Sequence, residues 1–159
     1  MKITILCVGK IKESFYREAI EEYAKRLSRY CKLDIVEVAD EKTPDKASET
    51  LREQIMEKEA ERLLPRLEEG AYVCTLEIQG KRYTSEAFAK DIDTVGLSGQ
   101  SHIIYVIVGS QALHEKVRKR ADMAISFSDM TFPHQLMRVI LCEQIYRAYR
   151  IICGEPYHK

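Results

Sequence analysis

Hydrophobic positions along this chain alternate between short β-branched runs and helically spaced stretches. The runs predict five strands, at 3–8, 33–39, 71–78, 103–108 and 123–127. The stretches between them predict helices at 14–30, 47–64 (ended or kinked by Pro65), 84–94, 114–121 and 133–152. This alternation predicts an α/β fold with a mainly parallel sheet flanked by helices.

Two strands carry further information about their place in the sheet. The run 103–108 is the most apolar, which is typical of a strand covered on both faces. Acidic residues interrupt the run 33–39, which places that strand nearer an edge. The 159 residues contain no repeat and no linker, so we expect a single domain spanning 1–159.

Charge and cysteine content narrow the function classes. The 25 basic and 25 acidic residues cancel, which excludes a chain-wide basic surface. Contact with nucleic acid would therefore need a local patch or a surface shared by two subunits. The five cysteines contain no CxxC pair, so we expect neither a disulfide framework nor a metal site. No apolar run is long enough for a membrane span, and we expect a cytoplasmic protein.

Three strand ends are candidate ligand sites, because ligands of open α/β sheets bind beyond the carboxyl ends of strands. Gly80 follows the third strand and Gly109-Ser110 the fourth, and a small-polar loop at 128–133 follows the fifth. Glycines at such ends allow close approach of backbone to a ligand. The alternative is that these are ordinary turns.

Familiar catalytic motifs are absent. The chain has no GxGxxG, no GxxxxGK[ST] and no GxSxG, and the sequence after His114-Glu115 departs from HExxH at Arg118. Hydrolase, nucleotide-kinase and zinc-protease readings therefore lose support. Another α/β module, such as a nucleotide-binding domain, is the weakest of three hypotheses.

The stretch 133–152 is apolar around most of a helix, which favours a homodimer interface. A central helix buried within one subunit is the alternative. Arg147 lies four residues after Glu143 and can pair with it, and the tail then presents Tyr157, His158 and Lys159. Basic and aromatic side chains of this kind hold phosphates and stack on unpaired bases, whereas an ordinary solvated face is the plainer interpretation.

At these residues the sequence resembles the bacterial large-subunit rRNA methyltransferase H family of the SPOUT class. The resemblance covers the chain from end to end. It rests on MKITILCVGKIKE at the start, LEIQGKRYTSEAFA at 76–89, and FSDMTFPHQLMRVILCEQIYRAYRI at 127–151 followed by GEPYHK.

The resemblance implies a C-terminal deep trefoil knot, a homodimer and S-adenosylmethionine as cofactor. It implies methyl transfer to N3 of a pseudouridine in a stem-loop of 23S rRNA, on the assembled 70S ribosome, without a metal or a membrane. The implied cofactor contacts are Leu76, Val108, Gly109, Phe127, Ser128, Asp129, Met130, Thr131 and Phe132. The implied catalytic residues are Arg147, Tyr157 and His158, and the implied substrate contacts are His134, Glu143, Arg150 and Lys159.

A dimer would concentrate the cations of the tail beside the partner's knot, together with those at 116–120. His158 is the expected base for the N3 proton, Arg147 the electrostatic helper and Tyr157 a stacking or orienting residue.

One departure from the family pattern concerns the fourth strand end. The family has Ile-Gly-Gly-x-x-Gly, whereas this chain has Ile107-Val108-Gly109-Ser110-Gln111-Ala112. Valine is poorly suited to positive φ, but an extended backbone at position 108 tolerates it. We expect a working pocket. The alternative is a non-catalytic knotted protein that binds ribosomes or RNA and has an impaired pocket.

Overall fold

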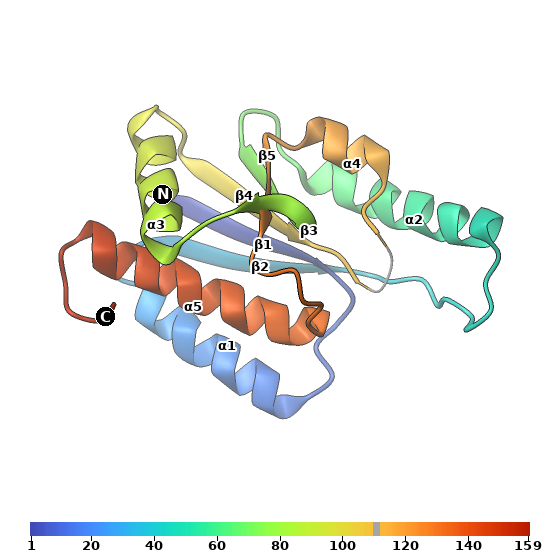
Figure 1. Ribbon diagram of the computed structural model, residues 1–159, viewed down its shortest axis with the longest axis horizontal. Helices are drawn as coiled ribbons and strands as arrows, with labels where there is room; N and C mark the ends of the chain where they lie inside the picture. The colour runs from blue at the N-terminus through green and yellow to red at the C-terminus, as the bar shows by residue number, and fades with distance from the viewer. Residues whose placement is uncertain (110–111) are drawn as a thin grey trace.

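The structure is a computed structural model that describes residues 1–109 and 112–159 (Figure 1). Its five strands form one parallel sheet in the order β2-β1-β4-β3-β5. They are β1 (Lys2–Val8), β2 (Lys32–Val38), β3 (Tyr72–Arg82), β4 (His102–Ile107) and β5 (Met123–Ser126). The predicted α/β class and parallel sheet are confirmed, as is the position of β2 at an edge.

Helices cover both faces of this sheet (Figure 1). They are α1 (Ser14–Leu27), α2 (Glu49–Leu63), α3 (Ser85–Leu97), α4 (Glu115–Arg120) and α5 (His134–Ile152), with a short 3-10 turn at Leu64–Arg66. The hydroxyl of Thr84 accepts from the N–H of Ala87 and caps the N-terminus of α3. Within the described residues, no helix has the length and hydropathy that crossing a membrane requires.

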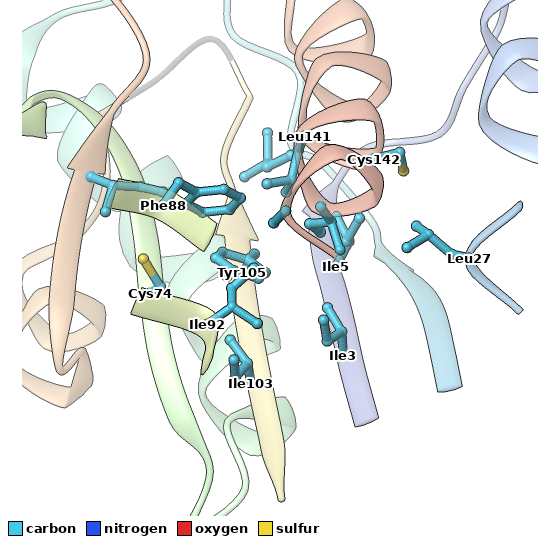
Figure 2. Packing of buried hydrophobic residues seen from close by; sticks show 14 of the residues in the cluster. Ile3, Ile5, Leu27, Cys74, Phe88, Ile92, Ile103, Tyr105, Leu141 and Cys142 are labelled. Atoms are coloured by element: carbon cyan, nitrogen blue, oxygen red, sulfur yellow. The ribbon is translucent and has the colours of Figure 1, made fainter. Parts of the chain in front are cut away.

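Alternating side chains of β4 enter two separate cores. Ile103, Tyr105 and Ile107 pack with α1, α3 and α5, as Figure 2 shows for Tyr105 beside Phe88 and Leu141. Ile104 and Val106 point to the other face and pack with residues of α2 and α4. The apolar run is therefore covered on both sides, as predicted.

The strand β3 is longer than the sequence predicts. Leu76 and Lys81 both pair with Ile125 of β5, so the intervening residues bulge out of the ladder. A Cβ atom on Gly80 would lie 2.6 Å from the carbonyl carbon of Ile125 and 2.7 Å from its amide nitrogen. Gly80 therefore brings two backbones of the protein together, whereas its sequence position suggested an approach to a ligand.

We expect Gly80→Ala to lower the free energy of unfolding by about 1–3 kcal/mol, because the added methyl group meets backbone that cannot move aside. Gly109→Ala is the matched control, since a Cβ atom there meets none of the described residues within 4 Å. Urea unfolding of both variants measures the difference. Equal stabilities would contradict this account of the β3 bulge.

The helix α5 lies against α1 and α3 on one face of the sheet. Its fully buried side chains are Arg138, Leu141, Cys142, Ile145 and Ala148. Packing within one subunit therefore accounts for much of its apolar circumference, which is the alternative raised above. The homodimer and the deep knot stay predictions.

Candidate functional site

A cavity of about 910 Å³ opens at the carboxyl ends of β3, β4 and β5. The predicted cofactor residues that line it are Leu76, Val108, Gly109, Phe127, Ser128, Met130, Thr131 and Phe132. Its size and mainly apolar lining are typical of a small-molecule site. Three strand ends that are distant in sequence therefore form one site, as the topology of parallel sheets requires.

The loop between β5 and α5 forms one wall of the cavity. The hydroxyl of Ser128 accepts from the N–H of Met130, and the hydroxyl of Ser126 donates to the carbonyl of Ser128, at 3.0 and 3.1 Å. Phe127 packs edge-on against Phe88 of α3. Asp129 is absent from the described lining and forms an ion pair with Arg82. The predicted contact of Asp129 with the cofactor stays a prediction.

The wall at the end of β4 contains the departure from the family pattern. Val108 lines the cavity and packs against the core of α2 and α4. None of the described residues other than glycine has positive φ, so Val108 sits in an ordinary backbone conformation. Ala112 also lines the cavity, whereas Ser110 and Gln111 lie outside the described residues.

The bulge of β3 supplies lining residues that sequence reasoning missed. Glu77, Ile78 and Gln79 face the cavity, and Arg118 of α4 reaches it from another element. Arg118 Nε donates to Glu77 Oε1 at 2.6 Å. Glu77 follows Leu76 directly in the quoted motif, but a bulge that turns both residues toward one cavity leaves no periodic signal.

His134 lines the cavity at the first turn of α5, and its predicted contact with substrate stays a prediction. Its Nδ1 atom is buried and has no hydrogen-bond partner among the described residues. Burial lowers the pKa of His134 below its ordinary value of 6.5, and the nearby Arg138 guanidinium lowers it further. The imidazole is thus neutral near pH 7 and available to a ligand as a polar group.

A pH dependence of stability follows from His134. The unfolded chain protonates this histidine more readily, so the free energy of unfolding is expected to fall as the pH drops from about 7 toward 5. The variant His134→Gln lacks this group and should show a weaker fall. Urea unfolding at several pH values tests this, and parallel pH profiles of the two proteins would contradict it.

Behind the cavity, Arg138 is completely buried. Its Nη1 donates to Glu37 Oε2 at 2.6 Å, and its Nη2 donates to the carbonyl of Gly9 at 2.7 Å. These contacts join the first turns of α5 to the ends of β1 and β2. An arginine within the most apolar stretch of this helix was the only sequence signal for this anchor.

The predicted catalytic residues gather at the opposite end of α5. Arg147 donates twice to Glu143 Oε1, at 2.9 Å from Nε and 2.5 Å from Nη2. Tyr157 donates to the same oxygen at 3.1 Å, and its ring lies 4.7 Å from the Arg147 guanidinium carbon. Burial, with the Glu143 carboxylate, raises the pKa of Tyr157 to about 12. The phenol therefore remains protonated and donates.

His158 completes this cluster. Arg147 Nη1 lies 3.1 Å from His158 Nδ1, and His158 Nε2 lies 2.6 Å from Glu86 Oε1. Because a guanidinium only donates, Nδ1 accepts and the ring proton is on Nε2, which donates to Glu86. This hydrogen bond is the main reason that the pKa of Glu86 is lowered. Glu86, in the first turn of α3, is a further member that sequence reasoning missed.

The chain reverses after α5 to bring the tail back onto the helix. Gly154 adopts φ +66°, and the N–H of Glu155 donates to the carbonyl of Arg150 at 2.8 Å. Arg150 also donates to Glu155 Oε2 and to the carbonyl of Pro156. Arg150 therefore holds the tail in place, and its predicted contact with substrate stays a prediction. Lys159 is exposed at the end of the tail.

The cavity and the tail cluster are separated along α5. His134 and Arg147 are thirteen positions apart, which is about 20 Å of helix at 1.5 Å per residue. One subunit therefore holds two distinct groups of candidate residues that do not meet.

The basic helix α4 carries less free charge than its sequence indicates. Lys116 pairs with Glu57, Arg118 with Glu77, Lys119 with Glu115 and Arg120 with Asp122. Acidic partners thus offset each cation of the predicted nucleic-acid patch at 116–120. The described residues include no group of three or more His, Cys, Asp or Glu side chains placed to hold a metal ion.

The parallel sheet and the cavity at its carboxyl edge define an α/β protein with a candidate small-molecule site at three strand ends. The sequence matches the family described as predicted SPOUT methyltransferases over residues 1–158, and the chain belongs to that family. It is 60% identical to the ribosomal RNA large subunit methyltransferase H of Bifidobacterium adolescentis. It is 55% identical to the protein of the same name from Clostridium beijerinckii, and both alignments cover the full length of both chains. The resemblance inferred from sequence is confirmed.

Proposed function

We propose that this protein transfers the methyl group of S-adenosylmethionine to N3 of a pseudouridine in 23S rRNA. The full-length relatives named as rRNA large subunit methyltransferases support an rRNA substrate. The observation that carries the proposal is that eight of nine predicted cofactor positions, Asp129 being the exception, line one cavity. The protein would act in the cytoplasm on assembled 70S ribosomes.

The cavity fits this cofactor. Its volume suits a nucleoside with a short side chain, and the loop 127–132 and the end of β4 offer backbone groups to an adenine ring. The buried, unpartnered Nδ1 of His134 supplies a polar contact. When bound, the cofactor supplies an electrophilic sulfonium methyl group, so the protein must chiefly align it with the target nitrogen.

The tail cluster is suited to the pseudouridine. His158 receives the N3 proton at Nδ1 after the base displaces Arg147 from that atom, and Glu86 at 2.6 Å from Nε2 stabilises the resulting imidazolium. Arg147 then stabilises negative charge on the deprotonated imide. Tyr157 orients the base by stacking, and Glu143 holds both Arg147 and Tyr157. Lys159, exposed at the end of the tail, would contact RNA phosphate.

The separation of about 20 Å along α5 supports a homodimer. A complete site would combine the cavity of one subunit with the tail of its partner. Large apolar side chains next to the cavity also favour a covering partner, since Met130 is 72% exposed and Ile78 is 48% exposed. Cations of the two tails would then form the local basic surface that a neutral chain needs to bind rRNA.

The decisive experiment mixes the purified protein with labelled S-adenosylmethionine and 70S ribosomes from a strain that lacks the modification. Mapping of the label on 23S rRNA is expected to find it on one pseudouridine. A catalytically competent relative with the glycine-rich motif, run in parallel, is the control. Label from that control alone would contradict the proposed activity.

The second candidate, a non-catalytic ribosome- or RNA-binding protein, rests on Val108 and Ala112. The ordinary backbone conformation at Val108 weakens it. Measurement of S-adenosylmethionine affinity for the wild type and Val108→Gly separates the two. If the wild type binds S-adenosylmethionine and Val108→Gly changes the affinity by no more than about threefold, the result supports the enzyme. If only the variant binds S-adenosylmethionine, the result supports an impaired pocket.

A further inference from the structure

Two oppositely charged side chains stand out in the cavity. Among the described lining residues, Glu77 and Arg118 are the ones with a formal charge near neutral pH, and the rest are apolar or neutral polar. Glu77 comes from the bulge of β3 and Arg118 from α4, so the pair joins two walls of the cavity.

The carboxylate of Glu77 is held at both oxygens. Thr75, which is buried at 1% exposure, donates from its hydroxyl to Glu77 Oε2 at 2.8 Å. Arg118 Nε donates to Glu77 Oε1 at 2.6 Å. The Glu77 side chain is only 16% exposed, so it is fixed in the cavity rather than free in solvent.

Arg118 still has unused donors. The Glu77 contact uses Nε, while Nη1 and Nη2 make no hydrogen bond with the described residues. These two groups form a planar fork that matches a carboxylate. Glu77 likewise retains acceptor capacity, since an ionised carboxylate offers about four lone-pair sites.

An ion pair of this exposure adds little to folding stability, because the Arg118 side chain is 49% exposed. Its placement is better explained by a ligand that carries both charges. An α-amino acid is such a ligand: its ammonium group donates and its carboxylate accepts. With Glu77 and Arg118 it would complete a ring of alternating charges.

We propose that Glu77 and Arg118 form the subsite for the methionine end of S-adenosylmethionine, with Glu77 binding the α-ammonium group and Arg118 the α-carboxylate. This assignment rests on the proposed function and deepens it. The adenosine part would then occupy the remaining, mainly apolar region between the ends of β4 and β5.

Two probes separate this subsite from the rest of the cavity. S-adenosylhomocysteine carries the amino-acid end, whereas 5′-methylthioadenosine lacks it and keeps the adenosine and the sulfur. Calorimetry with wild type, Glu77→Gln and Arg118→Gln should show about 10- to 100-fold weaker binding of S-adenosylhomocysteine by both variants. Affinity for 5′-methylthioadenosine should stay within about twofold. Arg118→Lys, which keeps the charge but not the fork, should give an intermediate loss.

Lys119→Gln is the matched control, because Lys119 is exposed on the same helix and pairs with Glu115. It should bind both probes like the wild type. If the Glu77 and Arg118 variants bind both probes equally more weakly, or bind both as the wild type does, the subsite assignment alone would be overturned. A wild-type protein that binds neither probe would overturn the proposed function and the subsite with it.

Discussion

Deletion of Tyr157–Lys159 is expected to abolish methyl transfer while leaving cofactor affinity unchanged. The deleted residues include the proposed base and the ring that packs on Arg147. A positioned base and its orienting partners contribute about 100-fold or more to a proton-transfer step, so the rate should fall at least that far. Methyl incorporation into unmodified ribosomes measures the rate, and calorimetry with S-adenosylhomocysteine measures the affinity.

The fold should survive this truncation, because the tail lies on the surface after α5 and its three residues are half-buried or exposed. Two substitutions refine the result. Tyr157→Phe keeps the ring that packs against Tyr146 and loses only the hydrogen bond to Glu143, so it should be milder than His158→Gln. Lys90→Ala, an exposed cation outside the cluster, is the control. Retained activity in the truncated protein would remove the tail from the mechanism.

Replacement of Arg138 by methionine is expected to cost about 3 kcal/mol of folding free energy. Methionine fills most of the aliphatic volume but leaves the Gly9 carbonyl and the Glu37 carboxylate without their buried donor. The Glu37 side chain is 35% exposed, so water can solvate its carboxylate once the arginine is gone. The expected loss of folding free energy is therefore near the lower end of the range for broken buried ion pairs. Urea unfolding measures this loss of stability, and the m-value should stay unchanged because only the stability is altered.

Lys119→Met is the control for Arg138→Met: it removes an exposed ion pair and should change the free energy of unfolding by less than about 0.5 kcal/mol.

Arg138→Met should also weaken S-adenosylhomocysteine binding, since the turns of α5 that Arg138 anchors carry His134 and Met137, which line the cavity. A stability loss as small as that of the control would show that Arg138 does not anchor α5.

Most of the fold could be predicted because the pattern of apolar and polar residues that indicates each strand or helix lies within that element. The β4 run and the acid-interrupted β2 each revealed their burial. The extent of β3 could not be predicted, because its last residues pair with β5 only through the bulge at Gly80. That pairing depends on a strand more than forty residues further along the chain.

The candidate site divides in the same way. The resemblance indicated nine cofactor positions, and eight of them line one cavity because they lie at the ends of neighbouring strands. It did not reveal the Glu77–Arg118 pair or the link from His158 to Glu86, because these contacts join residues 41 and 72 positions apart. The ion pair of Asp129 with Arg82 joins residues 47 positions apart and likewise left no signal in the motif.

The order of the strands also constrains when the protein can fold during its synthesis. β1 can pair early with β2 through α1, but its other edge waits for β4, whose residues lie about 100 positions along the chain. At about 5–20 residues per second, the ribosome needs roughly 3–14 s to make the chain between β2 and the end of β4. Throughout that interval an apolar strand edge stays open, and only β5 and α5, made last, complete the sheet and its cover. The nascent chain must therefore avoid aggregation until nearly all of it has been translated.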